Sequence, residues 1–364
     1  MTKPVLFVTN GHGEASIAGR IARELRGCGD FATEHFALVG SGLGEPSFVD
    51  VGPQQPMPSG GLVAMGNLRA FAADVRAGFF GLAARQFAFL SAAHERYAAV
   101  VAVGDAYALL FARVARRPAI FVGTAKSVYV APYGPAERRL LRTARRVFVR
   151  DSATADFLRG HGVAAEAPGN VIVDLLATDA RVDWHGAAER IALLPGSRAR
   201  AYDDGLRLAT VARLVARRVP GTAAVMSIAP GLATARFACA LTGEPPIASW
   251  HDDLGALLAD ATLALGQAGT ANEAAAACGV PVVAFEFDGA RKSAWYRMRQ
   301  ARLLGDALAV VPGEPERAAD AIAALLADPA RRAHMARVGR ERMGAGGGAA
   351  AIARAIAALT SPPG

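Results

Sequence analysis

Short runs of β-branched and apolar residues alternate with longer alanine- and leucine-rich stretches along the whole chain. In the longer stretches, such as Ser16–Arg26, the apolar residues recur at helical spacing, which predicts helices. The short runs predict strands. These are Val5–Thr9, Ala99–Val103, Ala119–Val122 and Arg146–Val149, and later Ile191–Leu194, Ala223–Ile228, Ala261–Leu265 and Val280–Phe285. Strand–helix alternation of this kind predicts parallel sheets with helices on both faces.

The alternation stops between residues 170 and 188 and then starts again, and Asp183–Gly186 within this break is typical of a linker. A chain of 364 residues has room for two domains. We therefore expect an α/β protein with two doubly wound, Rossmann-like domains that face each other across a cleft. The predicted domains are residues 1–175 and 186–345.

Two other segments depart from the alternation. Gly344–Gly348 interrupts the last helical pattern, so we expect the final helix, at 349–360, to turn back across the cleft and join the first domain. Pro53–Gly61 is rich in proline and glycine and predicts an irregular loop. The stretch that follows, Leu62–Ala93, mixes phenylalanines with arginines. It reads either as an ordinary core helix or helix pair, or as a surface that touches lipid.

Composition narrows the class of protein. Hydrophobic residues make up 52% and charged residues 20%, which excludes a disordered chain. The net charge is +8, but the basic residues are spread along the chain and no nucleic-acid-binding signature is present, so we expect no nucleic-acid partner. The positive charge remains compatible with a surface that binds phosphate groups or anionic lipid.

The spacing of the cysteines and the hydropathy of the chain predict where in the cell the protein is located. Three cysteines, Cys28, Cys239 and Cys278, form no paired pattern, which favours a reduced, cytoplasmic protein. We expect no signal segment, and no uninterrupted apolar run is long enough to predict a membrane span. These features predict a soluble protein or one that binds peripherally to the inner face of the membrane.

In open α/β sheets, ligands bind beyond the carboxyl ends of the strands, so four strand-to-helix junctions are candidates for chemistry. The first follows the opening strand and contains Gly11, His12, Gly13 and Glu14. Its glycines allow a close approach to a ligand, and a helix N-terminus favours an anion. His12 reads equally well as a proton-transfer group or as a solvated loop histidine.

The second junction is Gly104-Asp105, directly after a predicted strand. Asp105 reads first as the cap of the next helix and second as a general base. The third junction, Leu194–Arg198, brings Ser197 and Arg198 to the sheet edge, where a guanidinium can bind a diphosphate.

The fourth junction runs from Gly266 to an alanine-rich helix, where glycines beside a helix N-terminus can hold a diphosphate. Glu273 is expected in the first turn of that helix, where it can accept hydrogen bonds from two ribose hydroxyls or simply suit the helix dipole. The candidate donor-binding residues of the third and fourth junctions are Ser197, Arg198, Gln267, Gly269, Thr270, Ala271, Asn272 and Glu273.

Together these junctions resemble the B-type glycosyltransferases, and among them lipid A disaccharide synthase and its relatives. The matching segments are Leu194–Arg198, Gly269-Thr270-Ala271 with Glu273, Gly169-Asn170 with Asp174, and, closest to the synthase-related subfamily, Asn10–Glu14 and Gly123–Ser127. The resemblance covers nearly the whole chain in order. The differences fall mainly on the acceptor side, where Val128–Tyr133 replaces a tryptophan-rich segment.

The resemblance implies an inverting transfer of a sugar from a UDP-sugar, held by the second domain, to a lipid-like acceptor held by the first. Asp105 is the expected base, with His12 in reserve, and Arg198 and the helix at Gly269 would stabilise the departing diphosphate without a metal or cofactor. The residues expected to complete the cleft are Gly11, Gly13, Glu14, Lys126, Ser127 and Asn170. An anionic membrane is the expected surface partner.

Two other functions fit the same sequence. A non-hydrolysing UDP-sugar 2-epimerase shares the fold and would act on the donor alone. A nucleotide- or glycolipid-binding protein without catalysis also fits, because a fold does not fix a function.

Overall fold

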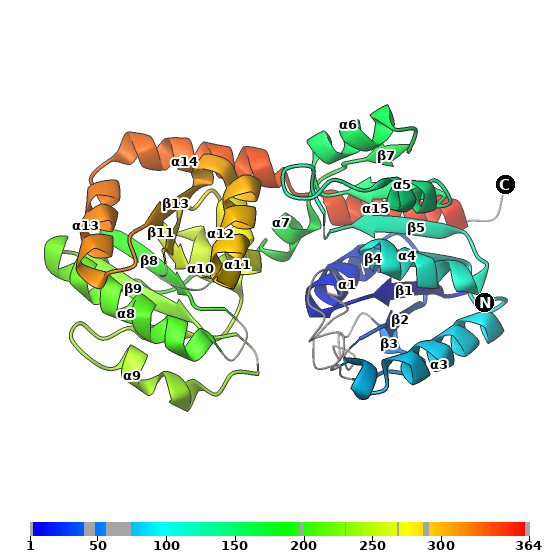
Figure 1. The fold of residues 1–364 in the computed structure, drawn as a ribbon, viewed down its shortest axis with the longest axis horizontal. Coiled ribbons are helices and arrows are strands. Elements are labelled where there is room, and N and C mark those ends of the chain that lie inside the picture. The colour runs from blue at the N-terminus through cyan, green and yellow to red at the C-terminus, as the bar shows by residue number, and fades with distance from the viewer. Residues whose placement is uncertain are drawn as a thin grey trace. The chain divides into compact units, whose positions relative to one another are not determined.

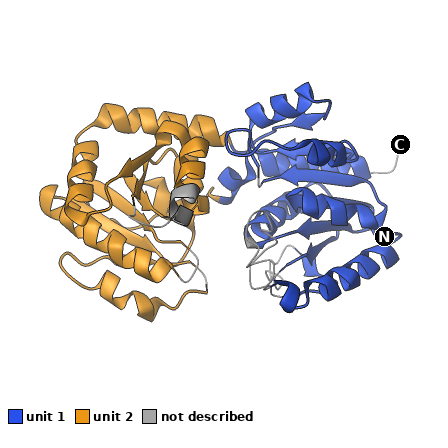
Figure 2. Ribbon diagram, in the orientation of Figure 1, with its two compact units in different colours: residues 1–175, 346–364 blue, residues 176–345 orange. Residues whose placement is uncertain are grey.

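The fold is known from a computed structural model (Figure 1). It describes residues 3–39, 48–55, 74–124, 126–196, 200–229, 231–267, 269–286 and 291–360, apart from the side chains of residues 12 and 291–296. The chain divides into two compact units (Figure 2). Unit 1 comprises residues 1–175 and 346–364, and unit 2 comprises residues 176–345.

Unit 1 contains a parallel sheet of seven strands in the order β3-β2-β1-β4-β5-β6-β7. The strands are β1 (Val5–Thr9), β2 (Thr33–Ala37), β3 (Val49–Asp50), β4 (Ala99–Gly104), β5 (Ala119–Gly123), β6 (Arg146–Val149) and β7 (Ala165–Glu166). The four strands predicted in this half are present. The other three escape the sequence pattern because β2 contains Glu34 and His35, and because β3 and β7 have only two residues each.

Helices cover both faces of this sheet. They are α1 (His12–Gly27), α3 (Phe79–Ala92), α4 (Ala106–Ala112), α5 (Pro135–Leu141), α6 (Ser152–Gly160), α7 (Val171–Leu175) and α15 (Gly348–Thr360), with a short 3-10 turn η1 (Arg113–Ala115). Successive strand residues point to opposite faces. Leu6 and Val8 therefore pack with α3, α4, α5 and α6. Val5 and Phe7 pack with α1, α7 and α15.

Helix α15 belongs to unit 1 although it follows the whole of unit 2 in the sequence. Asp174, at the end of α7, accepts hydrogen bonds from the backbone N–H groups of Gly347 and Ala349, so it caps the start of this helix. Ile352 and Ile356 are fully buried beside α1. The apolar helical stretch Pro329–Thr360 is long enough to cross a membrane, but Gly344 divides it into two helices, and the second is a core helix of unit 1.

Unit 2 contains a parallel sheet of six strands in the order β10-β9-β8-β11-β12-β13. The strands are β8 (Glu189–Leu194), β9 (Thr222–Ser227), β10 (Ala248–Trp250), β11 (Leu263–Gly266), β12 (Val282–Phe285) and β13 (Leu308–Val311). This is the Rossmann order. The four predicted strands are again present, with ends that differ by one or two residues. The edge strands β10 and β13 were not among the strands predicted from the sequence.

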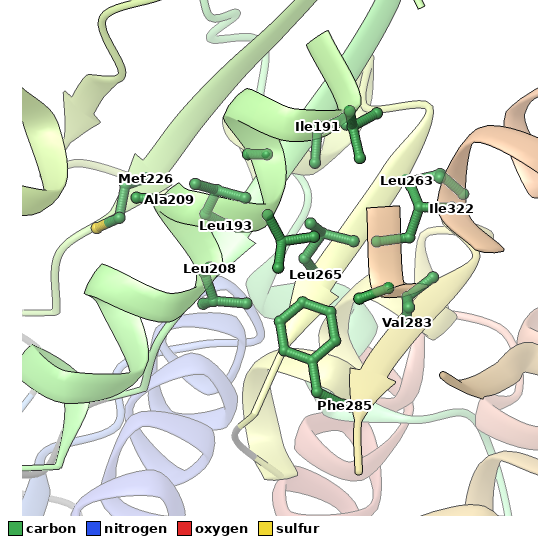
Figure 3. Close-up of a cluster of buried hydrophobic side chains, with 14 of the residues drawn as sticks. Ile191, Leu193, Leu208, Ala209, Met226, Leu263, Leu265, Val283, Phe285 and Ile322 are labelled. Atoms are coloured by element: carbon green, nitrogen blue, oxygen red, sulfur yellow. The ribbon is translucent and has the colours of Figure 1, made fainter. Parts of the chain in front are cut away.

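The helices of unit 2 are α8 (Ala201–Arg218), α9 (Ala238–Leu241), α10 (Leu254–Ala259), α11 (Gly269–Ala277), α12 (Arg291–Leu304), α13 (Pro315–Leu326) and α14 (Pro329–Met343), with 3-10 turns η2 (Thr234–Phe237) and η3 (Gly305–Ala307). Figure 3 shows how Leu193, Leu265 and Phe285 of the sheet meet Leu208 of α8 and Ile322 of α13. This core fixes the carboxyl ends of the central strands β8 and β11.

The ambiguous stretch Leu62–Ala93 ends in helix α3, and its residues 62–73 lie outside the described chain. Leu82 and Leu90 are buried, as expected of a core helix. On the opposite face Phe80 is 63% exposed and Phe87 is 56% exposed. The core-helix interpretation is therefore confirmed for the buried face, and lipid contact stays a prediction for the exposed face. The loop predicted at Pro53–Gly61 is described only to residue 55.

Candidate functional site

Each sheet changes direction at its centre. In unit 1 the chain moves from β1 outward to β2 and β3, and then returns to β4 on the other side of β1. In unit 2 the same reversal occurs between β8 and β11. Loops that leave two such strands diverge and leave room for a ligand at the carboxyl ends, which is the usual binding position in open α/β sheets.

At the unit-1 reversal, strand register brings two predicted site segments together. Thr9 of β1 pairs with Val103 of β4, so Asn10 and the Gly104-Asp105 pair leave the sheet side by side. The Asn10 side chain is buried, and its Nδ2 donates a 3.1 Å hydrogen bond to Oδ2 of Asp105. Asn10 Oδ1 is also buried but has no hydrogen-bond partner among the residues that the structure describes. An orphaned acceptor at a sheet edge suits a ligand hydroxyl.

Asp105 caps α4, as the first of its two interpretations proposed. Its Oδ1 accepts 3.1 Å hydrogen bonds from the backbone N–H groups of Tyr107 and Ala108. Its Oδ2 is left for the Asn10 amide and for anything that reaches the partly exposed edge. The cap therefore fixes the direction of the carboxylate without using both of its oxygens.

Glu14 lies against the same edge. A methyl group added to Gly104, whose φ of +124° favours glycine, would stand 2.8 Å from Cγ of Glu14. One added to Gly11 would stand 2.6 Å from Oε2 of Glu14. The two glycines thus leave the space that the glutamate side chain fills. Burial raises the pKa of the Glu14 carboxyl, its own backbone N–H opposes the rise, and the charge on Asp105 adds to it.

The structure corrects the expected loop at the first junction. Helix α1 begins at His12, four residues earlier than predicted, with Gly11 at its N-cap. Two glycines indicate a loop, but Gly13 is tolerated in the first helical turn, and Glu14 in that turn complements the helix dipole. His12 is therefore a helix residue, not a loop residue, and its side chain lies outside the described structure.

The three other predicted residues of unit 1 lie on later loops. Lys126 Nζ is 2.7 Å from Oε2 of Glu137. Ser127 is buried and its Oγ accepts a 3.3 Å bond from the N–H of Tyr129. Asn170 is buried, and its Oδ1 accepts a 3.1 Å bond from the N–H of Ile172 at the start of α7.

Asn170 also reaches the carboxyl edge of the sheet. It lines a small, mainly apolar cavity with Gly123, the last residue of β5, with Thr124 and with Arg150, which follows β6. The predicted cleft residues of unit 1 thus spread along the edge from β1 to β6. The structure brings Glu14 against Gly11 and against Gly104, the neighbour of Asp105, and leaves Lys126 and Ser127 with local partners.

At the unit-2 reversal, Gly266 of β11 pairs with Leu194 of β8, and the backbone N–H of Gln267 donates a 3.3 Å hydrogen bond to the Leu194 carbonyl. The ends of β8 and β11, at which the two junctions begin, therefore lie next to each other. Ser197 and Arg198 themselves fall outside the described residues. Gln267 has a buried Nε2 without a partner in the described structure.

Helix α11 begins at Gly269, which agrees with the predicted helix N-terminus, and Gly269 and Thr270 are exposed there. Asn272 is fully buried. Its Nδ2 donates to the Gly266 carbonyl at 3.3 Å and to Oε1 of Gln300 at 2.9 Å, so this side chain braces the loop. Gln300 of α12, in turn, donates a 3.1 Å bond to the Gly269 carbonyl.

One expectation at this junction is wrong. Glu273 is the fifth residue of α11 and lies in its second turn, not the first, because Gly269 and Thr270 are already helical. Ala271 and Glu273 are half-buried.

Two further side chains belong to these edges, Asn10, which the sequence placed in the first junction without a role, and Gln300, which it did not indicate. Asn10 stands directly before a predicted site residue, and the pairing of its strand with β4 is the signal that finds it. Nothing in the sequence points to Gln300. Across the described part of the chain, no three His, Cys, Asp or Glu side chains are grouped so as to hold a metal ion.

No known family description and no curated protein sequence matches this chain. Solved structures do match over nearly its whole length. UDP-N-acetylglucosamine 2-epimerase from Neisseria meningitidis, bound to UDP-N-acetylglucosamine, has a TM-score of 0.60 at 14% identity, covering 98% of this chain and 100% of that one. A calicheamicin glycosyltransferase gives 0.65 at 17% identity, with 98% of each chain covered. MurG from Acinetobacter baumannii gives 0.60 at 17% identity, covering 98% and 99%. The chain therefore has the two-domain GT-B fold that glycosyltransferases share with UDP-N-acetylglucosamine 2-epimerases.

Proposed function

We propose that this protein is a glycosyltransferase that moves a sugar from a UDP-sugar to a lipid-like acceptor, with inversion at the anomeric carbon, in the manner of lipid A disaccharide synthase. The observation that carries the proposal is the unit-1 edge, where Asn10, Glu14 and Asp105 place two carboxyl groups and an orphaned amide oxygen. A site of this kind can orient a hydroxyl and accept its proton.

Unit 2 is the proposed donor side. The exposed N-terminus of α11 offers backbone N–H groups to a diphosphate, and the helix dipole favours the negative charge. Arg198, from the neighbouring junction, would bind the same group, and Glu273 would accept the ribose hydroxyls. Similar solved structures support this assignment, since one is an epimerase bound to UDP-N-acetylglucosamine and another is described as a complex with UDP.

The chemical step needs a base and a stabilised leaving group. The acceptor hydroxyl gives its proton to Asp105, and its oxygen forms a bond with the anomeric carbon. The bond from that carbon to the UDP oxygen breaks, and its electron pair leaves with the diphosphate. His12 is the alternative candidate for the base. Positive charge from Arg198 and the α11 N-terminus would stabilise the departing UDP, so activity should persist in a chelator.

Binding of UDP tests the donor side. Arg198→Ala should weaken UDP binding by about 1.5–3 kcal/mol, because a charge-assisted hydrogen bond is lost. Arg217→Ala, which removes an exposed arginine in the last turn of α8, is the control and should bind UDP normally. Isothermal titration gives both affinities. Equal UDP affinity in the Arg198 variant and the control would contradict the assignment.

An epimerase is the second candidate, because several similar structures are UDP-N-acetylglucosamine 2-epimerases. The two activities differ in what they consume. An epimerase interconverts UDP-N-acetylglucosamine and its 2-epimer without an acceptor, whereas a transferase releases UDP only when an acceptor is present. Incubation of the wild-type protein with the donor alone, followed by NMR of the sugar, separates them.

The partner surface proposed for the lipid acceptor is the exposed face of α3. Phe80 and Phe87 lie seven residues apart on one face of this helix and are more than half exposed. Arg85 of the same helix is exposed, as is Arg113 of η1, which packs beside α3. Exposed aromatic and basic side chains together suit the surface of an anionic membrane. This proposal places the protein at the inner face of the membrane, in the cytoplasm.

Vesicle binding tests this surface. The wild type should co-sediment with anionic vesicles at low salt and less at high salt, since each basic residue near the surface contributes about 1 kcal/mol and salt screens it. Phe80→Ser/Phe87→Ser should lose most of the binding. Phe89→Leu, a change at a half-buried side chain that stacks on Phe36 inside unit 1, is the control. A wild type that stays in the supernatant at low salt would favour a soluble acceptor.

A further inference from the structure

Glu14 occupies an unusual position for a helix-starting glutamate. Acidic residues in a first helical turn are common because the dipole favours their charge, and there they normally face water. Glu14 instead folds back over the strand ends, into the space left by Gly11 and Gly104. The side chain is half-buried, and the effect of this burial on the pKa of its carboxyl outweighs that of its backbone hydrogen bond.

Asp105 supplies a second carboxyl group next to the strand end that Glu14 covers. Asp105 directly follows Gly104, and it is the charged side chain whose field acts on Glu14. The other elements packed on α1 carry two charged side chains to consider. Asp174 of α7 is engaged by backbone N–H groups of Gly347 and Ala349, and Arg354 of α15 is exposed.

On α1 itself, Arg20 is 2.9 Å from Glu24, and the His12 side chain lies outside the described structure. Within the described part of the chain, the local field on Glu14 is therefore set mainly by Asp105.

We propose that Glu14 and Asp105 form a proton-sharing pair, in which Glu14 completes the acid–base function of the unit-1 site. The inference deepens the proposed function and rests on it. Both oxygens of Asp105 already accept hydrogen bonds, Oδ1 from two backbone N–H groups and Oδ2 from the Asn10 amide. A proton taken from the acceptor hydroxyl is therefore held better by the pair than by Asp105 alone, and it passes from the pair to water after transfer.

Kinetics test the pair. Glu14→Gln keeps the side-chain volume but cannot take the proton, so turnover should fall by about 100-fold, with little change in the KM for the donor. Groups that act as one unit give strongly non-additive losses. The Glu14→Gln/Asp105→Asn double variant should thus be hardly slower than the slower single variant. Glu24→Gln, on the same helix and half-exposed, should have normal turnover.

Two kinetic results would overturn the pair. One is near-normal transfer by Glu14→Gln, and the other is a double variant whose loss equals the product of the single losses. Either result leaves the proposed function standing as long as the wild type transfers sugar. A wild type that turns over no UDP-sugar at all contradicts the proposed function instead.

Thermal stability as a function of pH tests the same pair without substrate. Because the folded-state pKa of Glu14 is raised, the folded protein binds more protons than the unfolded chain between the two pKa values. Its contribution to stability is therefore present at low pH and is lost as pH rises through the folded pKa. Glu14→Gln should match the wild type in Tm near pH 4 and exceed it at pH 8.

Asp105→Asn removes the charge that helps to raise this pKa. Combined with Asp105→Asn, the stabilisation by Glu14→Gln at pH 8 should become smaller. An Asp105→Asn background in which Glu14→Gln raises the Tm by the same amount as before would show that the two carboxyls are not coupled.

Discussion

Replacing Asp105 by asparagine should leave the protein folded and lower sugar transfer by about 100- to 10,000-fold. Asparagine caps a helix about as well as aspartate, so α4 keeps its first turn. The amide oxygen can still accept from the N–H groups of Tyr107 and Ala108, which now bind the carboxylate at 3.1 Å. What the variant loses is the ability to take a proton. Turnover by UDP release, together with the thermal midpoint, measures both effects.

The control for this substitution is a cap elsewhere in the chain. Asp328 caps α14 by accepting a 2.9 Å hydrogen bond from the N–H of Arg331, and Asp328→Asn should change neither stability nor transfer. If Asp105→Asn is stable and transfers sugar at a near-normal rate, Asp105 serves α4 alone and the base is to be sought at His12.

Truncating Ile352 to alanine should destabilise unit 1 by about 2–5 kcal/mol, the usual range for removing a large aliphatic side chain from a packed core. Ile352 is 1% exposed and belongs to the cluster that joins α15 to α1 and the sheet. The loss combines the transfer of the deleted methyl groups to water with the cavity left behind. Chemical denaturation, followed by far-UV circular dichroism, measures it.

Arg354, two residues further along α15, is exposed, so Arg354→Ala should change the free energy of unfolding by less than about 0.5 kcal/mol. If Ile352→Ala proves as mild as Arg354→Ala, the packing of α15 on unit 1 contributes little to stability. In that case α15 is an appendage of unit 1 and not part of its core.

The central strands of both sheets could be predicted from the sequence because they are buried on both faces and read as continuous apolar runs. Val5–Thr9 is such a run. The other strands could not, because they are short or are interrupted by polar residues. Thr33–Ala37 contains a glutamate and a histidine, and Val49–Asp50 is too short to form a pattern.

Only part of the candidate site could be predicted from the sequence. The junctions followed from the rule that ligands bind at the carboxyl ends of strands, and Asp105 and Gly269 stand where that rule places them. The relation between Glu14 and Asp105 could not be predicted, since they are far apart in sequence and the register of β1 on β4 brings their segments together. The hydrogen bond between Asn272 and Gln300 could not be predicted either, because these two residues are also far apart in sequence.

The return of α15 to unit 1 sets the order in which the protein can fold as it is synthesised. Unit 2 is complete once residue 345 has left the ribosome, whereas unit 1 lacks a helix of its core until residues beyond 346 emerge. Although its sheet is made first, unit 1 must therefore wait with the apolar face of α1 uncovered while all of unit 2 is translated. Domains usually fold in the order of their synthesis. Here the unit that begins the chain is the last to close.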